Sequence, residues 1–289
     1  MNDPTKQTAG IVWLASFPKS GNTWTRAFLH NLLKIMQGET DGLTSVNKMA
    51  EYSTWEMGAK LFDQILGKPA TEATQAEIAA ARPKAQAELA GQSEGMILVK
   101  THNALVLDRG FPTINFAVTS GAIYVVRNPL DVVISYAHHM SRTIDQTIKA
   151  MEIRGAETAV NEKVVYEVYG SWSQHVESWT KKPHRAIYVM RYEDMLANAA
   201  ATFGKLARHL LLNPTPAQLK KAIELSSFDR LQKLEQEEGF VEKPKTAEKF
   251  FREGRSGQWQ EKLTDEQVNR IIAVHGEQMA RFGYLPPKT

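Results

Sequence analysis

A short apolar run, Ile11–Ser16, leads directly into a turn rich in Pro, Gly and Ser at 17–22, and a helical pattern over Trp24–Met36 follows. An apolar run bounded by turn residues predicts a buried strand. Three further runs of this kind occur along the chain: Met96–Val99, Ala122–Val126 and Ala186–Met190. Because helical patterns separate these strands, the sequence predicts an α/β fold with a mostly parallel sheet covered by helices on both faces.

Other helical patterns fill much of the remaining chain. Further helices are expected at Glu162–Thr180, Ala199–Leu211, Thr215–Leu225 and Asp265–Phe282, with shorter ones across residues 40–92. Within 40–92, the Ala-rich stretch Thr71–Ala90 predicts an exposed helix that is interrupted or capped near Pro83. Gln236–Gln258 has no clear period and is rich in Glu, Lys and Gly, so we expect a mobile segment (236–258) that folds over a ligand.

Composition limits the chemistry that the chain can perform. Its 289 residues contain no cysteine, which excludes disulfide bonds, thiolate metal sites and a cysteine nucleophile. The length suits a single domain over 1–289, and a net charge of +3 with both signs mixed favours a small anionic ligand over nucleic acid. The polar start of the chain predicts no signal peptide, and no apolar run is long enough for a membrane span. We therefore expect a cytoplasmic protein with no membrane partner.

Polar side chains follow each predicted strand. Lys19, His102, Arg127 and Tyr192 all come just after the end of one. Ligands of open α/β sheets bind outside the carboxyl ends of the strands. The sequence therefore predicts a ligand site built from these four residues and their neighbours.

The segment Pro18–Trp24, which reads PKSGNTW, lies between the first strand and its helix. The backbone N–H groups of such a turn, with the helix N-terminus behind them, can cradle a phosphate. In this segment Gly21 permits a close approach, Lys19 adds a positive charge, and three residues supply hydrogen-bond donors: Ser20, Asn22 and Thr23. The Lys precedes the Gly, so this is not the Walker A pattern, and an ordinary turn is the alternative.

Two more strand ends carry candidate residues. His102, after Lys100 and Thr101, could take a proton from an acceptor near neutral pH, although a lone histidine is more often a surface or core residue. Arg127 suits a bidentate grip on a second phosphate. It precedes Asn128 as a helix cap and Asp131, for which capping is a better explanation than catalysis.

Together these segments resemble the cytosolic sulfotransferase family. The family's P-K-S-G-T-T-W is matched by Pro18–Trp24, its K-T-H by Lys100–His102 and its R-N-x-x-D-x-x-x-S-Y by Arg127–Tyr136. Its Y-E-D-M is matched by Tyr192–Met195, and its R-K-G-x-x-G-D-W, with changes, by Arg252–Trp259. The motifs keep their order over nearly the whole chain.

The resemblance implies a three-layer P-loop-like fold and the donor 3′-phosphoadenosine-5′-phosphosulfate (PAPS), which leaves as PAP without a required metal. It implies that Lys19–Thr23 hold the 5′-phosphosulfate, that Trp24 stacks on adenine, and that His102 is the general base with Lys100 and Lys19 as electrostatic helpers. The remaining donor-binding residues that it implies are Arg127, Ser135, Tyr192, Ser226, Phe228, Arg252 and Gly254. Glu253 stands where the family has Lys, which puts one contact to the 3′-phosphate in question, and Arg255 could compensate.

Alternatives to this function remain open from the sequence. A kinase-like phosphotransferase with a degenerate P-loop would need Mg²⁺ carboxylates, for which Asp194 is the only plausible candidate. A non-catalytic nucleotide-binding module is the other alternative. The acceptor, a small molecule with a hydroxyl or amine, and the oligomeric state cannot be read from the sequence. Six aromatic residues could line an acceptor pocket, although core positions are the first expectation: Tyr52, Trp55, Phe111, Phe116, Tyr166 and Tyr169.

Overall fold

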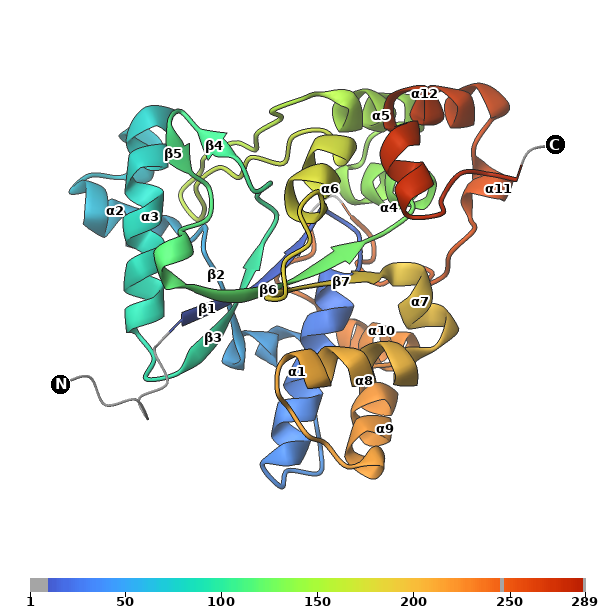
Figure 1. Ribbon diagram of the computed structural model, residues 1–289, viewed down its shortest axis with the longest axis horizontal. Helices are drawn as coiled ribbons and strands as arrows, with labels where there is room; N and C mark the ends of the chain where they lie inside the picture. The colour runs from blue at the N-terminus through green and yellow to red at the C-terminus, as the bar shows by residue number, and fades with distance from the viewer. Residues whose placement is uncertain (1–9, 245–246, 288–289) are drawn as a thin grey trace. The chain divides into compact units, whose positions relative to one another are not determined.

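The computed structural model describes residues 10–244 and 247–287. Five strands form a central sheet in the order β2-β3-β1-β6-β7, and helices flank it (Figure 1). β3 pairs in parallel with both β1 and β2, and Trp13 of β1 lies opposite Val99 of β3. The predicted α/β fold class is therefore confirmed. The prediction of a polar start without a signal peptide concerns residues 1–9, which lie outside the described residues.

The four predicted strands are all present, and three more are short. The strands are β1 Gly10–Ser16, β2 Ser53–Trp55, β3 Met96–Thr101, β4 Leu107–Asp108, β5 Phe111–Pro112, β6 Thr119–Val126 and β7 Ile187–Arg191. The α-helices are α1 Asn22–Met36, α2 Ala59–Leu66, α3 Gln75–Gly91, α4 Pro129–Met140, α5 Ile144–Glu152, α6 Trp172–Thr180, α7 Tyr192–Ala197, α8 Ala199–His209, α9 Pro216–Leu225, α10 Phe228–Glu238, α11 Trp259–Lys262 and α12 Asp265–Arg281. The 3₁₀ turns are η1 Val46–Glu51, η2 Ala70–Glu72 and η3 Phe116–Val118.

The chain forms two compact units. Unit 1 holds the chain up to Phe17 with Ser53–Tyr124 and Ile153–Ile187, and unit 2 holds Pro18–Tyr52, Val125–Glu152 and the chain from Tyr188 onward. Each unit contains a buried apolar cluster, centred on Phe62 and Tyr166 in unit 1 and on Phe240 and Phe251 in unit 2. That all of this is one sulfotransferase-type domain stays a prediction.

The Ala-rich helix of unit 1 differs from its prediction. α3 runs without a break from Gln75 to Gly91 with Pro83 inside it, and eight of its residues, including Ile78 and Leu89, are buried. An internal proline costs roughly 3 kcal/mol because it removes one hydrogen bond and crowds the preceding turn. Packing of α3 against α2 offsets this cost, and the carbonyl of Pro83 accepts a hydrogen bond from Asn115 at 2.8 Å. Alanines give almost no apolar periodicity, so the buried face could not be seen in the sequence.

The predicted helix over Glu162–Thr180 is also wrong in its first half. Residues 162–171 form no helix. Val164 and Val168 make isolated β-bridges with Gly58 and Glu157, and α6 begins only at Trp172, where the side chain of Ser171 accepts a hydrogen bond from the Gln174 N–H. Val165 donates its N–H to Met57, and Val168 accepts one from Ala104. The β-branched residues in this stretch favour the extended backbone, which these non-local bonds hold.

In unit 2, the described part of the segment 236–258 is packed. α10 extends into it as far as Glu238, and the Glu235 carboxylate accepts the N–H groups of Phe250 and Phe251 at 2.7 and 2.9 Å. The ring of Phe240 packs against both of these phenylalanines. Residues 245–246 of the segment lie outside the described residues, and its mobility stays a prediction.

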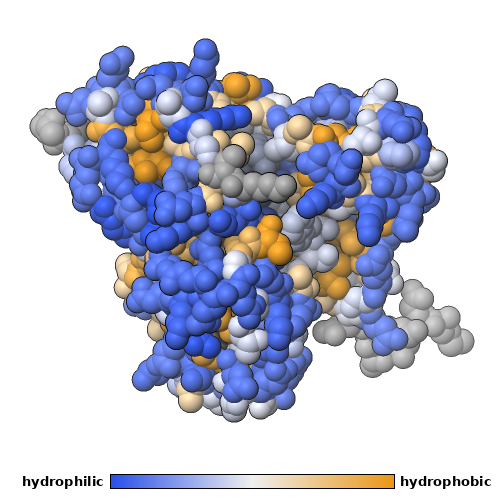
Figure 2. Space-filling view, turned by 180° about the vertical axis from the view of Figure 1, so that it is seen from behind, coloured by the Kyte–Doolittle hydropathy of each residue, from blue (hydrophilic) through white to orange (hydrophobic). Residues whose placement is uncertain are grey.

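The surface is mainly hydrophilic. On the face seen in Figure 2, hydrophobic residues form only small separate patches. Within residues 10–244 and 247–287, no helix is long and apolar enough to cross a membrane.

Candidate functional site

The Pro18–Thr23 turn of unit 2 connects the end of β1 to α1. Lys19 and Gly21 both have positive φ, 66° and 112°, which turns successive backbone N–H groups in one direction. A side chain at Gly21 would come within 2.8 Å of the Tyr192 ring, so the turn needs glycine for space as well as for its backbone. The Ser20 hydroxyl is buried and has no hydrogen-bond partner among the described residues. A buried hydroxyl donor at a turn that leads into a helix N-terminus fits a phosphate or sulfate oxygen.

Arg127 follows β6 and joins this turn to the C-terminal loop. Its guanidinium donates to the carbonyl oxygens of Lys19 and Arg255, both at 3.1 Å. Its Cζ lies 4.3 Å from the centre of the Tyr192 ring. Both hydrogen-bonded acceptors are neutral, and its buried Nε has no partner among the described residues. The side chain is therefore held in place while its positive charge is not neutralised by a carboxylate in these bonds.

Tyr192, which lies beside Arg127, is one of the residues predicted to contact the nucleoside. The Trp24 ring makes edge contacts with Tyr192 and Phe203, with centroids 5.8 and 5.6 Å apart. Burial raises the pKa of Tyr192, which keeps its hydroxyl protonated. Ser226 is fully buried and donates its hydroxyl proton to Ala222 at 2.7 Å, so that hydroxyl can only accept from a ligand.

Two further predicted residues, Gly254 and Phe228, are in direct contact, because a side chain added at Gly254 would overlap the Phe228 ring. Gly254 also has a positive φ of 60°. Ser135 lies half-buried on α4, two turns after Arg127.

The Arg252–Trp259 loop is organised by carboxylates. Glu253 pairs with Arg252, with Arg255 at 3.0 Å and with Lys262 at 2.5 Å. Burial alone would raise the pKa of Glu253, but these cations lower it overall. Asp131 accepts the N–H groups of Gly257 and Trp259 at 2.7 and 3.1 Å. Asp131 thus anchors this loop, a role that the prediction of helix capping did not include.

His102 of unit 1 has a defined orientation. Its Nδ1 lies 2.7 Å from the carbonyl oxygen of Ser16, and a carbonyl can only accept. The Nδ1 proton therefore points at Ser16, and the neutral ring carries its lone pair on Nε2. Its backbone N–H donates to Glu167 at 2.8 Å, and its ring meets Tyr169 edge-on at 6.1 Å. This tautomer suits a general base that uses Nε2.

Both groups of residues lie within a stretch of the chain that matches one known protein family. The sulfotransferase domain model matches residues 10–283. The chain belongs to the sulfotransferase family. It is 25% identical over 277 residues to sulfotransferase 1B1 of Canis lupus familiaris, an alignment that covers 92% of this chain and 82% of that protein. It is 29% identical over 191 residues to a 3-alpha-hydroxysteroid sulfotransferase of Cavia porcellus, covering 62% of this chain and 61% of that one.

Solved structures share the sulfotransferase fold. Retinol dehydratase in complex with androsterone and inactive cofactor PAP matches with a TM-score of 0.66 at 17% identity, over 98% of this chain and 84% of that chain. A mouse sulfotransferase complexed with PAP matches with a TM-score of 0.58 at 19% identity, over 94% and 85% of the two chains.

Sequence reasoning missed two buried carboxylates beside His102 in this sulfotransferase. Glu56 accepts hydrogen bonds from Thr101, from Asn103 at 2.8 Å and from Gln86 at 2.5 Å. Glu167 is buried, and this burial raises its pKa. A lone Glu inside the apolar run Val164–Tyr169 was the available signal, because a charge in such a run is rarely left without partners.

The predicted site residues thus separate by unit. Lys19 and all the predicted donor-binding residues lie in unit 2, whereas His102 and Lys100 lie in unit 1. The Lys100 ammonium lies 5.3 Å from the centre of the Trp55 ring. Within the described part of the chain, no group of three or more His, Cys, Asp or Glu side chains is placed to hold a metal ion.

Proposed function

We propose that this sulfotransferase transfers the sulfuryl group of PAPS to a hydroxyl or amine of a small-molecule acceptor, with His102 as general base. The observation that carries the proposal is the turn after β1. There, two positive-φ residues, a buried Ser20 hydroxyl with no partner in the described part of the chain and the adjoining N-terminus of α1 all fit an anionic oxygen. The solved relatives named above were crystallised with PAP, whose phosphate groups supply anionic oxygens of this kind.

The donor residues divide by the part of PAPS that they would hold. Residues Lys19–Thr23 bind the 5′-phosphosulfate. Arg127, with Ser135, Arg252 and Gly254, binds the 3′-phosphate, because its forked guanidinium suits a phosphate and its hydrogen bonds go to neutral carbonyls. The aromatic residues Trp24, Tyr192 and Phe228, with Ser226, line the nucleoside.

His102 performs the proton transfer in this proposal. Its Nε2 removes the proton from the acceptor as the acceptor oxygen or nitrogen attacks sulfur in line. Ser16 and Glu167 hold the ring for this step through Nδ1 and the backbone N–H. Lys19, helped by Lys100, neutralises the negative charge that grows on the transferred and leaving oxygens.

The acceptor is a small molecule rather than a nucleic acid or a membrane lipid, and the enzyme acts as a single cytoplasmic domain. Retinol dehydratase was crystallised with androsterone and PAP in one structure and with retinol and PAP in a second, and both androsterone and retinol are small apolar alcohols. They support this acceptor class without fixing the acceptor of this chain.

Calorimetry tests the donor, with PAP titrated against ADP and against ATP with Mg²⁺. Tight metal-independent binding of PAP, with ADP at least roughly tenfold weaker, is the expected result, since only PAP carries the 3′-phosphate. Equal affinity for PAP and ADP would contradict the proposal. A preference for ATP with Mg²⁺ would instead favour a phosphotransferase. Transfer of ³⁵S from labelled PAPS to a panel of phenols, alcohols and amines then identifies the acceptor class.

A further inference from the structure

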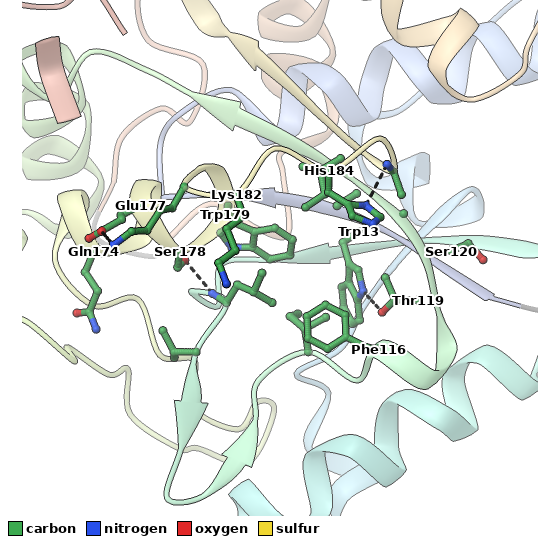
Figure 3. A pocket seen from close by; sticks show the side chains of 18 of the residues that line it. Trp13, Phe116, Thr119, Ser120, Gln174, Glu177, Ser178, Trp179, Lys182 and His184 are labelled. Carbon is green, nitrogen blue, oxygen red and sulfur yellow. Dashed lines mark hydrogen bonds and ion pairs between the residues drawn. The ribbon is translucent and has the colours of Figure 1, made fainter. Parts of the chain in front are cut away.

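A large pocket lies within unit 1, and no residue assigned above to sulfuryl transfer is among those that line it. Its volume is about 620 Å³, which is in the range of small-molecule sites. The residues that line it come from β1, the 105–122 region and the segment from α6 to β7, together with Arg154. Of the aromatic residues considered above for an acceptor pocket, Phe116 is among them, whereas no predicted catalytic or donor-binding residue lines it. In Figure 3, Trp13, Phe116 and Trp179 face the hollow, with Lys182 and His184 on one side of it.

The pocket exists because small residues begin β6. Where the strand starts, Thr119, Ser120 and Gly121 place no large side chain against Trp13. A larger residue cannot replace Gly121, since its Cβ would lie 2.8 Å from the carbonyl oxygen of Ala186. The pocket therefore results from the small side chains at the start of β6 and from the close approach of Gly121 to Ala186.

The walls are apolar and held rigidly. The indole N–H of Trp13 donates to Thr119 at 2.9 Å, and that of Trp179 donates to the carbonyl of Asn103 at 3.0 Å. Trp179 also stacks on Tyr124, with centroids 6.0 Å apart. Because the indole N–H groups of Trp13 and Trp179 are both hydrogen-bonded, the two rings present apolar faces that need no rearrangement to receive a ligand.

The rim is cationic. Four basic side chains line the pocket, Arg154, Lys181, Lys182 and His184, against the single carboxylate of Glu177. Lys181 pairs with Glu177 at 2.6 Å, whereas Lys182 and Arg154 have no carboxylate within ion-pair distance in the described part of the chain. Phe116, which also lines the pocket, is 67% exposed, so its ring is open to a ligand that enters from solvent.

We propose that this pocket is a second ligand site of the protein, which binds an amphipathic organic anion. The ligand has a flat or extended apolar body and one carboxylate, sulfate or sulfonate head. The body lies between Trp13, Trp179 and Phe116, and the head lies at Lys182 and Arg154. This site does not depend on the proposed transfer reaction.

Fluorescence titration of the full-length protein with 8-anilinonaphthalene-1-sulfonate tests the site, because this probe combines a bicyclic aromatic body with one sulfonate. Saturable binding is expected, and Phe116→Ala should weaken it about tenfold because part of the apolar wall is lost. The matched control is Phe111→Ala, another exposed phenylalanine of unit 1 that does not line the pocket, which should bind like the wild type.

The charge of the rim is tested separately. Lys182→Glu should weaken binding of the sulfonate at least about fivefold, whereas Lys60→Glu, the same change at an exposed position on α2, should not. The uncharged analogue N-phenyl-1-naphthylamine should bind more weakly than the sulfonate to the wild type and equally to wild type and Lys182→Glu. No saturable binding, or unchanged binding in both Phe116→Ala and Lys182→Glu, would overturn the site. Equal affinity for the charged and uncharged probes would overturn the assignment to an anion.

Discussion

In unit 2 the positively charged residues around the Pro18–Thr23 turn are held by carbonyl oxygens and aromatic rings, whereas in unit 1 the residues around His102 are held by buried carboxylates. Arg127 donates to two carbonyls and lies over Tyr192, and Lys19 lies 4.0 Å from the centre of the Phe250 ring. His102 instead donates its backbone N–H to Glu167. Neutral partners fix a cation without consuming its charge, so the first arrangement suits an anionic ligand. In the second arrangement a carboxylate fixes the His102 backbone, and the Ser16 carbonyl orients the imidazole ring for proton transfer.

This comparison predicts that the two regions fail in different ways when they are altered. His102→Ala should lower kcat roughly a thousandfold, since it removes the general base. The affinity for PAP, measured by calorimetry, should stay within about twofold of the wild type because His102 is not among the residues assigned to the donor. A loss of PAP affinity as large as the loss of kcat would contradict the division of roles.

Arg127→Ala should produce the opposite pattern. The affinity for PAP should fall roughly a hundredfold, because a charge-assisted bidentate contact to a phosphate is lost. Arg127→Lys keeps the charge but not the fork and should lie between this variant and the wild type. ADP, which lacks the 3′-phosphate, should bind wild type and Arg127→Ala about equally, which separates loss of the contact from collapse of the turn that Arg127 braces. An equal loss for PAP and ADP would show that the arginine acts only by positioning Lys19.

Much of this arrangement could be predicted because its determinants are local. A strand, a turn and a helix start follow one another within Ile11–Met36, and Asn128 caps α4 with a hydrogen bond from Leu130 as expected. Each of these features depends on neighbours in the sequence. The family motifs added the roles of residues such as Ser226 and Phe228, which no spacing would have indicated.

The unpredicted parts depend on partners far along the chain. Glu56 accepts hydrogen bonds from Gln86 and Asn103, and Glu167 accepts one from His102. These partners lie far away in the sequence, so the structural role of the two carboxylates could be identified only in the structure. The same is true of residues 162–171, whose apolar spacing predicts a helix, whereas backbone hydrogen bonds of Val165 to Met57 and of Ala104 to Val168 hold the stretch in a non-helical conformation. The buried face of α3 was hidden because alanine carries little apolar signal.

Within unit 2, Arg252 differs from Arg127 because it is paired with the carboxylate of Glu253. Glu253→Gln should raise the affinity for PAP roughly fivefold, because Arg252 would no longer be neutralised by this side chain, whereas Arg255 would keep its pair with Glu261. Glu261→Gln is the matched control, since Glu261 pairs with Arg255 at 2.8 Å, and it should change PAP binding little. If Glu253→Gln instead weakened PAP binding, the carboxylate would be shown to hold Arg252 in position rather than to compete with the phosphate.

The smallest expected effect concerns the carboxylates of unit 1. Burial raises the pKa of Glu167 above its ordinary value of 4.5, so the folded state binds this proton more tightly than the unfolded state. The free energy of unfolding should therefore fall as the pH rises from about 4.5 through the raised pKa. Glu167→Gln can still accept the His102 N–H but carries no titrating proton. Urea unfolding at pH 4.5, 6 and 8 should show the variant gaining stability relative to the wild type with rising pH, whereas the exposed Glu162→Gln should not. Parallel pH profiles for wild type and Glu167→Gln would mean that hydrogen bonds from His102 and Tyr169 fully compensate the buried charge.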